Sequence, residues 1–459
     1  MSELLGAKLL GGANEIGASC ALVFCRDDLG NEKVIAIDSG IRMKNIKGGV
    51  MTEGHEMPNC EVHAVLATHA HADHIGNLPV LIKANPRARV YMSRPTFYIA
   101  GAVWLDTLRL MDTEKIQASL DDICDFSEGA RIIVKENFDN IILRPGWVNI
   151  FPGIDAYFGP NGHIRGSAFI VLKAGGKQVM FSGDISVYDS PTILGMKVPE
   201  QFIGNLDAIF VESTYGDRTL VNRLEEEERM AKLANETLSN GGRCLFPAFG
   251  IGRSPDVLLA QLIRNVSPLF LDGMGRKILD IYSGETGYWS GLDHSSGVDL
   301  INDRRIRFIR DRGHREGLIY DSRMPFSVVT TAGMMIPGSC AWQYATNGHF
   351  LENPHNLLGL TGYQAEQTEG HQIEQTIEGG KEVDLTGFKA RVNARVVKLS
   401  LSSHADGMQI GDIVKKLGPQ KVFINHGYPA GKDGLEATLR ILGYQGEIHK
   451  PCNGDTIQF

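Results

Sequence analysis

The chain has 459 residues, and its 46 lysines and arginines stand against 54 aspartates and glutamates, giving a formal net charge of −8 at pH 7. This length allows two ordinary domains or one elaborated domain with a large core. The acidic balance argues against a protein that attracts nucleic acid through its overall charge. A site that holds divalent cations would still be positive locally, so a nucleic-acid substrate is not excluded.

The seven cysteines are scattered along the chain and form no Cys-x-x-Cys pair. This usage is typical of a protein in the reducing cytoplasm. The first residues lack the basic and apolar segments of a secretory leader, and no stretch reaches the length of a membrane span. We therefore expect a soluble cytoplasmic protein with no membrane partner.

The N-terminal part of the chain predicts β-strands. Apolar runs of strand length cover residues 8–10, 19–24 and 33–37. The last of these runs ends at Asp38. An aspartate in this place is as typical of a simple turn as of a residue that supports a nearby metal ligand, so both interpretations stay open.

The densest cluster of polar side chains follows the next apolar run. Residues 68–76 read Thr-His-Ala-His-Ala-Asp-His-Ile-Gly. A strand that ends in a tight loop would place His69, His71, Asp73 and His74 around one small volume. Three imidazoles and a carboxylate are typical zinc ligands, and the absence of cysteine from the loop argues against a closed structural site. The sequence therefore predicts a metal site here.

Polar side chains recur where later predicted strands begin or end. His163 lies in a glycine-flanked loop before a strand, Asp184 and Glu212 follow two further strands, and His404 and His426 come after two late strands. A lone histidine or carboxylate is more often structural than a ligand. Rigid strands are nevertheless the right place for a site with several metal ions, because a small misplacement is costly for catalysis.

Between about residues 213 and 388 the pattern changes to alternating helices and strands, which predicts an inserted α/β unit. Helices are expected over 224–238 and 254–263. We expect the inserted unit to cover the metal site and to leave a cleft for a single strand. The glycine-rich segments 250–254 and 333–339 would offer backbone N–H groups to phosphates at helix starts, or are ordinary tight turns.

With these pieces together, the chain resembles the metallo-β-lactamase superfamily, and within it the β-CASP nucleases, over nearly its whole length. The superfamily positions look like Asp38, the loop 69–74, His163, Asp184 and His426. The β-CASP motifs look like Glu212 in Val-Glu-Ser-Thr-Tyr-Gly, His404 in Ser-His-Ala-Asp and His426 in Asn-His-Gly. The opening glycine-rich turn and the segment around His163 look closer to the pre-mRNA cleavage endonucleases than to ribonuclease J.

The resemblance implies an α/β fold, an αββα metallo-β-lactamase sandwich with an inserted α/β β-CASP domain. It implies that residues 1–212 form the first part of the sandwich, that 213–388 form the insertion, and that 389–459 complete the sandwich. These boundaries are expectations for the tertiary structure.

The resemblance also implies two zinc ions per chain. By the superfamily pattern, one zinc would be held by His69, His71 and His163, the other by Asp73, His74 and His426, with Asp184 bridging the two. Two divalent ions can activate a hydroxide for attack on a phosphodiester and stabilise the charge that develops.

The remaining positions receive catalytic roles. His404 is the expected general acid, because imidazole titrates near neutrality. Glu212 would orient His404 and raise its pKa. Asp38 would accept an N–H from a ligand histidine or steady the hydroxide, and Asp73 counts both as a ligand and as a catalytic residue.

The third β-CASP position favours RNA, because it is a histidine in RNA-processing members and typically an apolar residue in DNA-processing ones. We therefore predict a ribonuclease that acts on single-stranded RNA, with endonucleolytic cutting favoured and 5′-exonucleolytic trimming as the second mode. The alternatives are a DNA nuclease, a small-molecule metallo-hydrolase of the same superfold and a non-catalytic scaffold subunit. RNA is the expected partner, and a homodimer is allowed.

Overall fold

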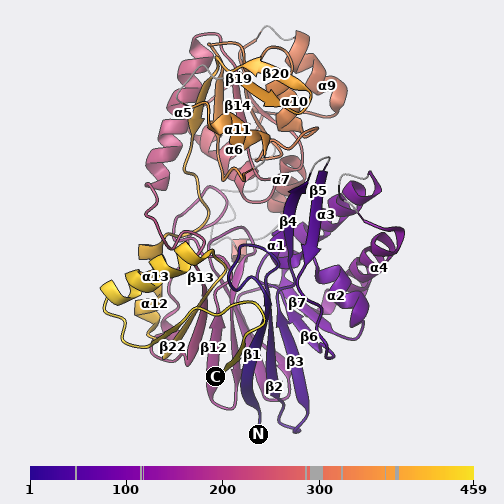
Figure 1. The fold of residues 1–459 in the computed structure, drawn as a ribbon, viewed down its shortest axis with the longest axis vertical. Coiled ribbons are helices and arrows are strands. Elements are labelled where there is room, and N and C mark those ends of the chain that lie inside the picture. Colours follow the sequence, from indigo (N-terminus) through magenta and orange to yellow (C-terminus); the bar gives the residue numbers. More distant parts are fainter. Residues whose placement is uncertain are drawn as a thin grey trace.

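The computed structural model describes residues 1–46, 49–113, 116, 118–284, 287–289, 303–321, 324–366, 368–377 and 382–459. The described residues form two seven-stranded sheets, and a six-stranded sheet lies above them in the view of Figure 1. A separate two-stranded ribbon pairs β4 (Ile41–Ile46) with β5 (Gly49–Gly54). None of the described helices combines the length and the apolar character needed to cross a membrane.

The first sheet has the strand order β24-β1-β2-β3-β6-β7-β8. Its strands are β1 (Glu3–Gly11), β2 (Cys20–Arg26), β3 (Glu32–Ile37), β6 (Ala64–Leu66), β7 (Arg89–Ser93), β8 (Ile141–Ile142) and β24 (Thr456–Gln458). β3, β6, β7 and β8 run parallel to one another. Their carboxyl ends therefore share one edge of the sheet, where Asp38 follows β3 and His69 comes shortly after β6.

The second sheet has the order β23-β22-β13-β12-β11-β10-β9. Its strands are β9 (Gly146–Phe151), β10 (Ile154–Pro160), β11 (Ala168–Ala174), β12 (Lys177–Phe181), β13 (Ala208–Glu212), β22 (Lys421–Asn425) and β23 (Glu447–His449). β12, β13 and β22 are parallel neighbours, so Asp184, Glu212 and His426 come at the same edge. β11 is antiparallel to β12, and His163, which precedes it, lies at that edge too.

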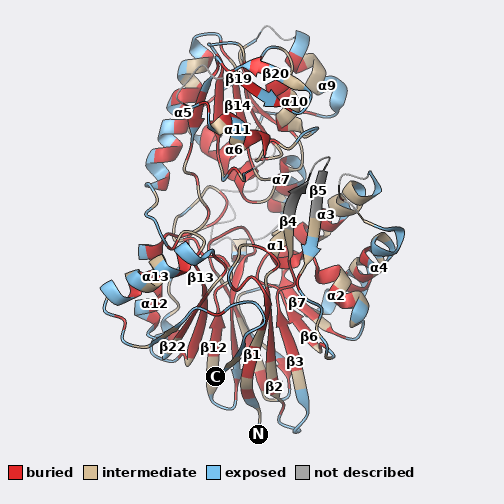
Figure 2. Ribbon diagram, viewed as in Figure 1, coloured by how far each residue is buried: buried red, intermediate tan, exposed pale blue. Residues whose placement is uncertain are grey.

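Helices cover the outer face of each of these sheets. α1 (Ala72–Ile75), α2 (Leu78–Ala84), α3 (Arg94–Asp112) and α4 (Leu120–Glu136) share a core with the first sheet, and α12 (Gly407–Leu417) and α13 (Pro429–Ile441) share one with the second. The inner faces meet in a third core, where Phe210 stacks on Phe181 and Phe423 at ring-centroid distances of 4.6 and 4.8 Å. Figure 2 shows buried residues along the strands and exposed ones on the outer helix faces. The predicted αββα sandwich is confirmed.

The third sheet is parallel throughout and has the order β16-β15-β17-β14-β18-β21. Its strands are β14 (Cys244–Pro247), β15 (Leu269–Leu271), β16 (Ile306–Phe308), β17 (Ser327–Thr330), β18 (Leu357–Leu360) and β21 (Arg395–Lys398). α5 (Arg223–Ser239) and α6 (Arg253–Ile263) pack on one face. α10 (Cys340–Thr346) and α11 (Glu369–Glu374) pack on the other. This is the inserted α/β unit that the sequence predicted.

Shorter elements complete the described chain. They are α7 (Gly275–Gly284), α9 (Arg312–Glu316), the π-helical turn η4 (Gly317–Asp321) and the 3-10 turns η1 (Phe138–Asn140), η2 (Glu200–Phe202) and η3 (Gly287–Trp289). α7 contacts α3 and thereby joins the inserted unit to the sandwich.

The predicted end of the inserted unit at residue 388 falls inside a hairpin. β19 (Glu382–Leu385) pairs with β20 (Phe388–Arg391), and β21 then pairs with β18 in the third sheet. The chain therefore leaves this sheet only after β21, a position that no change of composition marks. Residues 285–286, 290–302, 322–323, 367 and 378–381 of the predicted insertion lie outside the described residues.

Candidate metal centre

The loop after β6 turns sharply into α1 and brings its polar side chains together. The amide of His74 donates to the carbonyl of His71 at 3.0 Å, which closes the turn. The backbone after β3 lies against this loop, since a Cβ on Gly40 would come within 1.7 Å of the carbonyl oxygen of Asp73. Only glycine allows so close an approach of two backbone segments.

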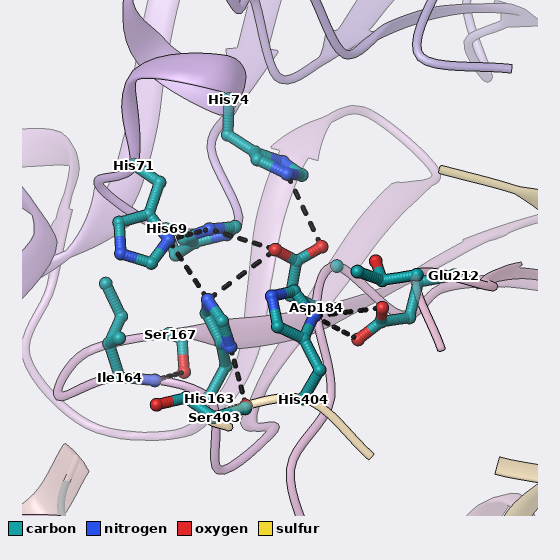
Figure 3. Close-up of polar contacts among 12 residues, drawn as sticks. His69, His71, His74, His163, Ile164, Ser167, Asp184, Glu212, Ser403 and His404 are labelled. Atoms are coloured by element: carbon teal, nitrogen blue, oxygen red, sulfur yellow. Dashed lines mark hydrogen bonds and ion pairs between the residues drawn. The ribbon is translucent and has the colours of Figure 1, made fainter. Parts of the chain in front are cut away.

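Four atoms form a first group of candidate ligands, drawn in Figure 3. Nδ1 of His71 lies 3.1 Å from Nε2 of His69 and 3.0 Å from Nε2 of His163. Oδ2 of Asp184 lies 3.5 Å from each of these Nε2 atoms. Ligands about 2.0–2.1 Å from a tetrahedral zinc ion lie about 3.3–3.4 Å apart. The spacing therefore fits one zinc ion.

A second group uses the other oxygen of Asp184. Oδ1 of Asp184 lies 3.4 Å from Nε2 of His74 and 3.3 Å from Nδ1 of His426. Oδ2 of Asp73 lies 3.5 Å from Nε2 of His426 and 4.0 Å from Nε2 of His74. The sequence separates Asp73 and His426 widely, and the structure brings them together.

Three atoms of the second group are buried without a hydrogen-bond partner among the described residues. They are Nε2 of His74, Oδ1 of Asp184 and Nε2 of His426. Leaving one buried polar atom unpaired costs about 1–3 kcal/mol. Two imidazole nitrogens and a carboxylate oxygen left unpaired at one buried site are a donor set that suits a divalent cation.

Asp38 orients one of the candidate ligands. Its Oδ2 accepts a hydrogen bond from Nδ1 of His74 at 2.7 Å, which leaves Nε2 of His74 to face Asp184. The amide and the hydroxyl of Thr68 donate to the two oxygens of Asp38 at 2.6 and 2.7 Å. A metal-binding histidine usually has its second nitrogen held in this manner. The contacts therefore favour the supporting role of Asp38 over a simple turn.

His163 is oriented by a group that sequence reasoning missed. Its Nδ1 donates to the backbone carbonyl of Ser403 at 2.8 Å, so Nε2 faces the first ligand group. A backbone carbonyl leaves no signal in the residue types, and the two positions lie 240 residues apart. The same loop continues into His404, so this contact also ties the first ligand group to the next feature.

The charge states of the histidines in the first ligand group suit a metal site. Burial and the neighbouring histidines hold the pKa of His69 and that of His163 well below the ordinary value. Both rings are therefore neutral near pH 7, the form that binds metal. Burial raises the pKa of Asp184, but the rings of His426 and His74 outweigh this and hold that pKa well below its usual range.

His404 and Glu212 form an ion pair beside the first ligand group. Nδ1 of His404 lies 3.1 and 3.0 Å from the two oxygens of Glu212, and Oε1 of Glu212 also accepts from the amide of Ile185 at 2.6 Å (Figure 3). Burial lowers the pKa of His404, but the Glu212 carboxylate outweighs it and raises this pKa to about 9. The ring centroids of His404 and His163 are 4.5 Å apart. A protonated imidazole therefore stands next to the candidate ligands.

Two family models match this chain. The model of the metallo-beta-lactamase superfamily matches residues 30–226, and that of the Zn-dependent metallo-hydrolase RNA specificity domain matches residues 389–451. Together the matches cover more than half of the chain and contain all the candidate residues. The chain belongs to the metallo-β-lactamase superfamily.

Similar proteins of this superfamily carry ribonuclease names. The chain is 29% identical to the RNase J-like protein of Methanocaldococcus jannaschii, over 92% of each protein. It is 27% identical to RNase aCSPSF2 of Saccharolobus solfataricus over 98% of this chain and 84% of that protein. It is 25% identical to endoribonuclease YSH1 of Yarrowia lipolytica over 98% of this chain, but it spans only 53% of that relative.

One solved structure has a fold similar to that of this chain. A protein of unknown function from Enterococcus faecalis superposes with a TM-score of 0.61 at 13% sequence identity, over 100% of both chains. At this identity the likeness concerns the fold alone.

Zinc should stabilise the protein, because it would pair the buried atoms of His74, Asp184 and His426 that lack partners. A ligand at about one hundred times its Kd adds about 2.7 kcal/mol to the free energy of unfolding. We expect zinc to raise the Tm of chelator-treated protein, measured by circular dichroism. Magnesium should raise it much less, since it prefers six oxygen ligands. A Tm that zinc leaves unchanged would contradict a metal site.

Replacing Asp38 should weaken zinc binding without unfolding the chain. Asp38 has a φ of 61°, a value that asparagine tolerates, so Asp38→Asn preserves the backbone. Loss of the carboxylate that holds His74 should lower zinc affinity about 10–100-fold, measured by competition with a chelator. Asp139→Asn, at an exposed residue of η1, is the matched control and should leave the affinity unchanged.

Proposed function

We propose that this chain is a zinc-dependent ribonuclease that hydrolyses phosphodiester bonds in single-stranded RNA. The observation that carries the proposal is the pair of ligand groups that share Asp184, with the protonated His404 beside them. The match of residues 389–451 to an RNA specificity domain and the ribonuclease names of the relatives support RNA as the substrate.

Two zinc ions would occupy the two ligand groups. His69, His71 and His163 would hold one ion and Asp73, His74 and His426 the other, with Asp184 contributing one oxygen to each. When bound, such a pair lowers the pKa of water toward neutrality and stabilises negative charge on phosphoryl oxygens.

His404 would serve as the general acid. Its Nδ1 faces Glu212, so Nε2 is the nitrogen left to donate a proton to the departing oxygen as the phosphorus–oxygen bond breaks. The side chain of His404 is 20% exposed, whereas that of Glu212 is 1% exposed. Substrate can therefore reach His404 but not Glu212. Glu212 would hold the ring in place and keep it protonated until the transfer.

The chain would form one sandwich with a covering unit. We propose that residues 1–212 and the segment after β21 build the sandwich, and that the unit between them covers the ligand groups and forms one wall of the RNA-binding cleft. Endonucleolytic cutting is the mode we favour, with 5′-exonucleolytic trimming as the second mode and a homodimer as an allowed assembly.

The substrate class can be tested directly with the zinc-loaded protein. We expect cleavage of labelled single-stranded RNA, both linear and circular, and little cleavage of single-stranded DNA or of a thioester. Cleavage of the circle shows endonuclease activity, because a circle has no end for trimming. Faster hydrolysis of DNA or of the thioester than of RNA would replace the proposed substrate.

The role of His404 can be tested with His404→Ala, which should lower kcat for RNA cleavage about 10²–10⁴-fold, the contribution of a general acid. Zinc content, measured by atomic emission, should stay at the wild-type value. His449→Ala is the matched control, because His449 forms an exposed pair with Glu447 at 3.1 Å in β23, and its kcat should not change. Loss of zinc from His404→Ala would instead make His404 a ligand.

A further inference from the structure

Arg253, the first residue of α6, is a buried cation with two side-chain nitrogens that have no partner among the described residues. Only 9% of the residue is exposed. Its Nε and Nη1 atoms are enclosed, and among the described residues neither has a hydrogen-bond partner. Burial and the nearby Arg223 lower its pKa to about 10, so the guanidinium remains charged at neutral pH.

The two neighbouring carboxylates already serve other groups. Glu227 accepts from Nε of Arg223 at 2.8 Å through Oε1 and pairs with Nη1 of Arg264 at 3.0 Å through Oε2. Oδ2 of Asp256 accepts a hydrogen bond from Nη2 of Arg223 at 3.4 Å. Its Oδ1 accepts from the hydroxyls of Thr192 and Ser190 at 2.6 and 3.0 Å. Three arginines thus share two carboxylates, and within the described part of the chain Arg253 is the one without an ion pair.

A buried charge without a counter-ion is costly, because burial removes it from water and nothing replaces the lost hydration. An apolar side chain of similar volume would avoid this cost. The geometry therefore calls for an anion that the described part of this chain does not supply.

The backbone at the start of α6 does not provide the expected donors. The amide of Ser254 donates to the carbonyl of Phe249 at 2.9 Å, and the amide of Arg253 to that of Ile251 at 2.8 Å. Pro255 has no amide hydrogen. These two amides are therefore already paired and are not free to bind phosphate, whereas Nε and Nη1 of the Arg253 side chain have no partner among the described residues.

The start of α6 lies beside the loop that carries His163. A Cβ on Gly252 would come within 2.5 Å of Cγ2 of Ile164, so the start of α6 packs directly against the residue that follows His163. Tyr215 is among the groups that act on the charge of Arg253, and its ring centroid lies 5.8 Å from that of His404.

Arg223, the neighbour of Arg253, contacts the loop that carries His404. Nη1 of Arg223 donates to the carbonyls of Leu401 and Ser402, both at 3.0 Å, just before the loop reaches Ser403 and His404. The unpaired cation is thus at the joint between the inserted unit and the sandwich.

We propose that Arg253 binds a backbone phosphate of the RNA strand next to the bond that is cut. The ligand is a phosphodiester anion, and the planar guanidinium offers two nitrogens in a fork that suits its oxygens. This inference rests on the proposed ribonuclease function and adds a substrate-binding residue from the inserted unit. RNA would thereby contact both parts of the chain at once.

The test compares Arg253→Met with wild type in the zinc-loaded protein. Methionine keeps much of the volume and removes the charge and the donors. We expect the Kd for a fluorescently labelled single-stranded RNA, measured by anisotropy, to rise about tenfold. The slope of log Kd against log salt concentration should fall by about 0.7, the value for one phosphate contact on a single strand.

Two further variants sharpen the comparison. Arg253→Lys keeps the charge and loses the fork, so it should retain the salt slope while binding RNA more weakly than wild type. Arg305→Met is the matched control, because Arg305 precedes β16 at the amino edge of the parallel sheet, whereas Arg253 follows the carboxyl end of β14. It should leave both the Kd and the slope unchanged.

The stability of Arg253→Met separates binding from structure. Removing an unpaired buried charge should leave the Tm unchanged or raise it. A clear fall in Tm together with a wild-type Kd and salt slope would show a structural role and overturn the proposal. Wild-type RNA affinity in Arg253→Met overturns it as well, even if the enzyme cleaves RNA as expected.

If the wild-type protein neither binds nor cleaves RNA, inorganic phosphate tests the anion site at Arg253 on its own. That result would remove the ribonuclease function but not the anion site. Phosphate should then raise the Tm of wild type above its value in chloride at equal ionic strength, and should have no such effect on Arg253→Met. Equal effects of phosphate on both proteins would overturn the anion site itself.

Discussion

Asp184 is the side chain on which the arrangement of the site depends. Its two oxygens face the two ligand groups, Oδ2 toward His69 and His163 and Oδ1 toward His74 and His426. One buried carboxylate can serve both groups only if the loops from both sheets reach it from opposite sides. The pairing of β12 with β11 and β13 fixes its position, so the two halves of the sandwich must pack in one register for either group to form.

The second sheet also positions the pair formed by Glu212 and His404, because Glu212 lies at the same edge of the sheet as Asp184. Glu212 ends β13, directly beside β12, and its partner His404 reaches it from a loop near the end of the chain. The carboxylate is almost fully buried and also accepts from the amide of Ile185, which follows Asp184. The position of His404, the candidate acid, is therefore tied to the ligand groups through one short backbone segment.

The inserted unit is joined to the sandwich by charged and polar contacts as well as by apolar packing. Arg165, which lies two residues after His163, donates to the carbonyl of Tyr282 in α7, and its guanidinium lies 5.1 Å from the centre of that ring. Arg223 in α5 bonds the loop before His404. The inserted unit thus contacts the segments that carry a candidate ligand and the candidate acid, so a displacement of this unit would change the geometry of the site.

Local sequence determined the elements and the loop from His69 to His74, because apolar periodicity and ligand spacing are properties of neighbouring residues. It also indicated, through resemblance, the αββα sandwich and the distant residues that the structure brings together around Asp184. Only tertiary structure decided the pairing of β21 with β18, the carbonyl of Ser403 that holds His163, and the two nitrogens of Arg253 that find no partner among the described residues. Each depends on which backbone groups and charges meet across hundreds of residues, and the type of a residue does not record whether its neighbours in space are already paired.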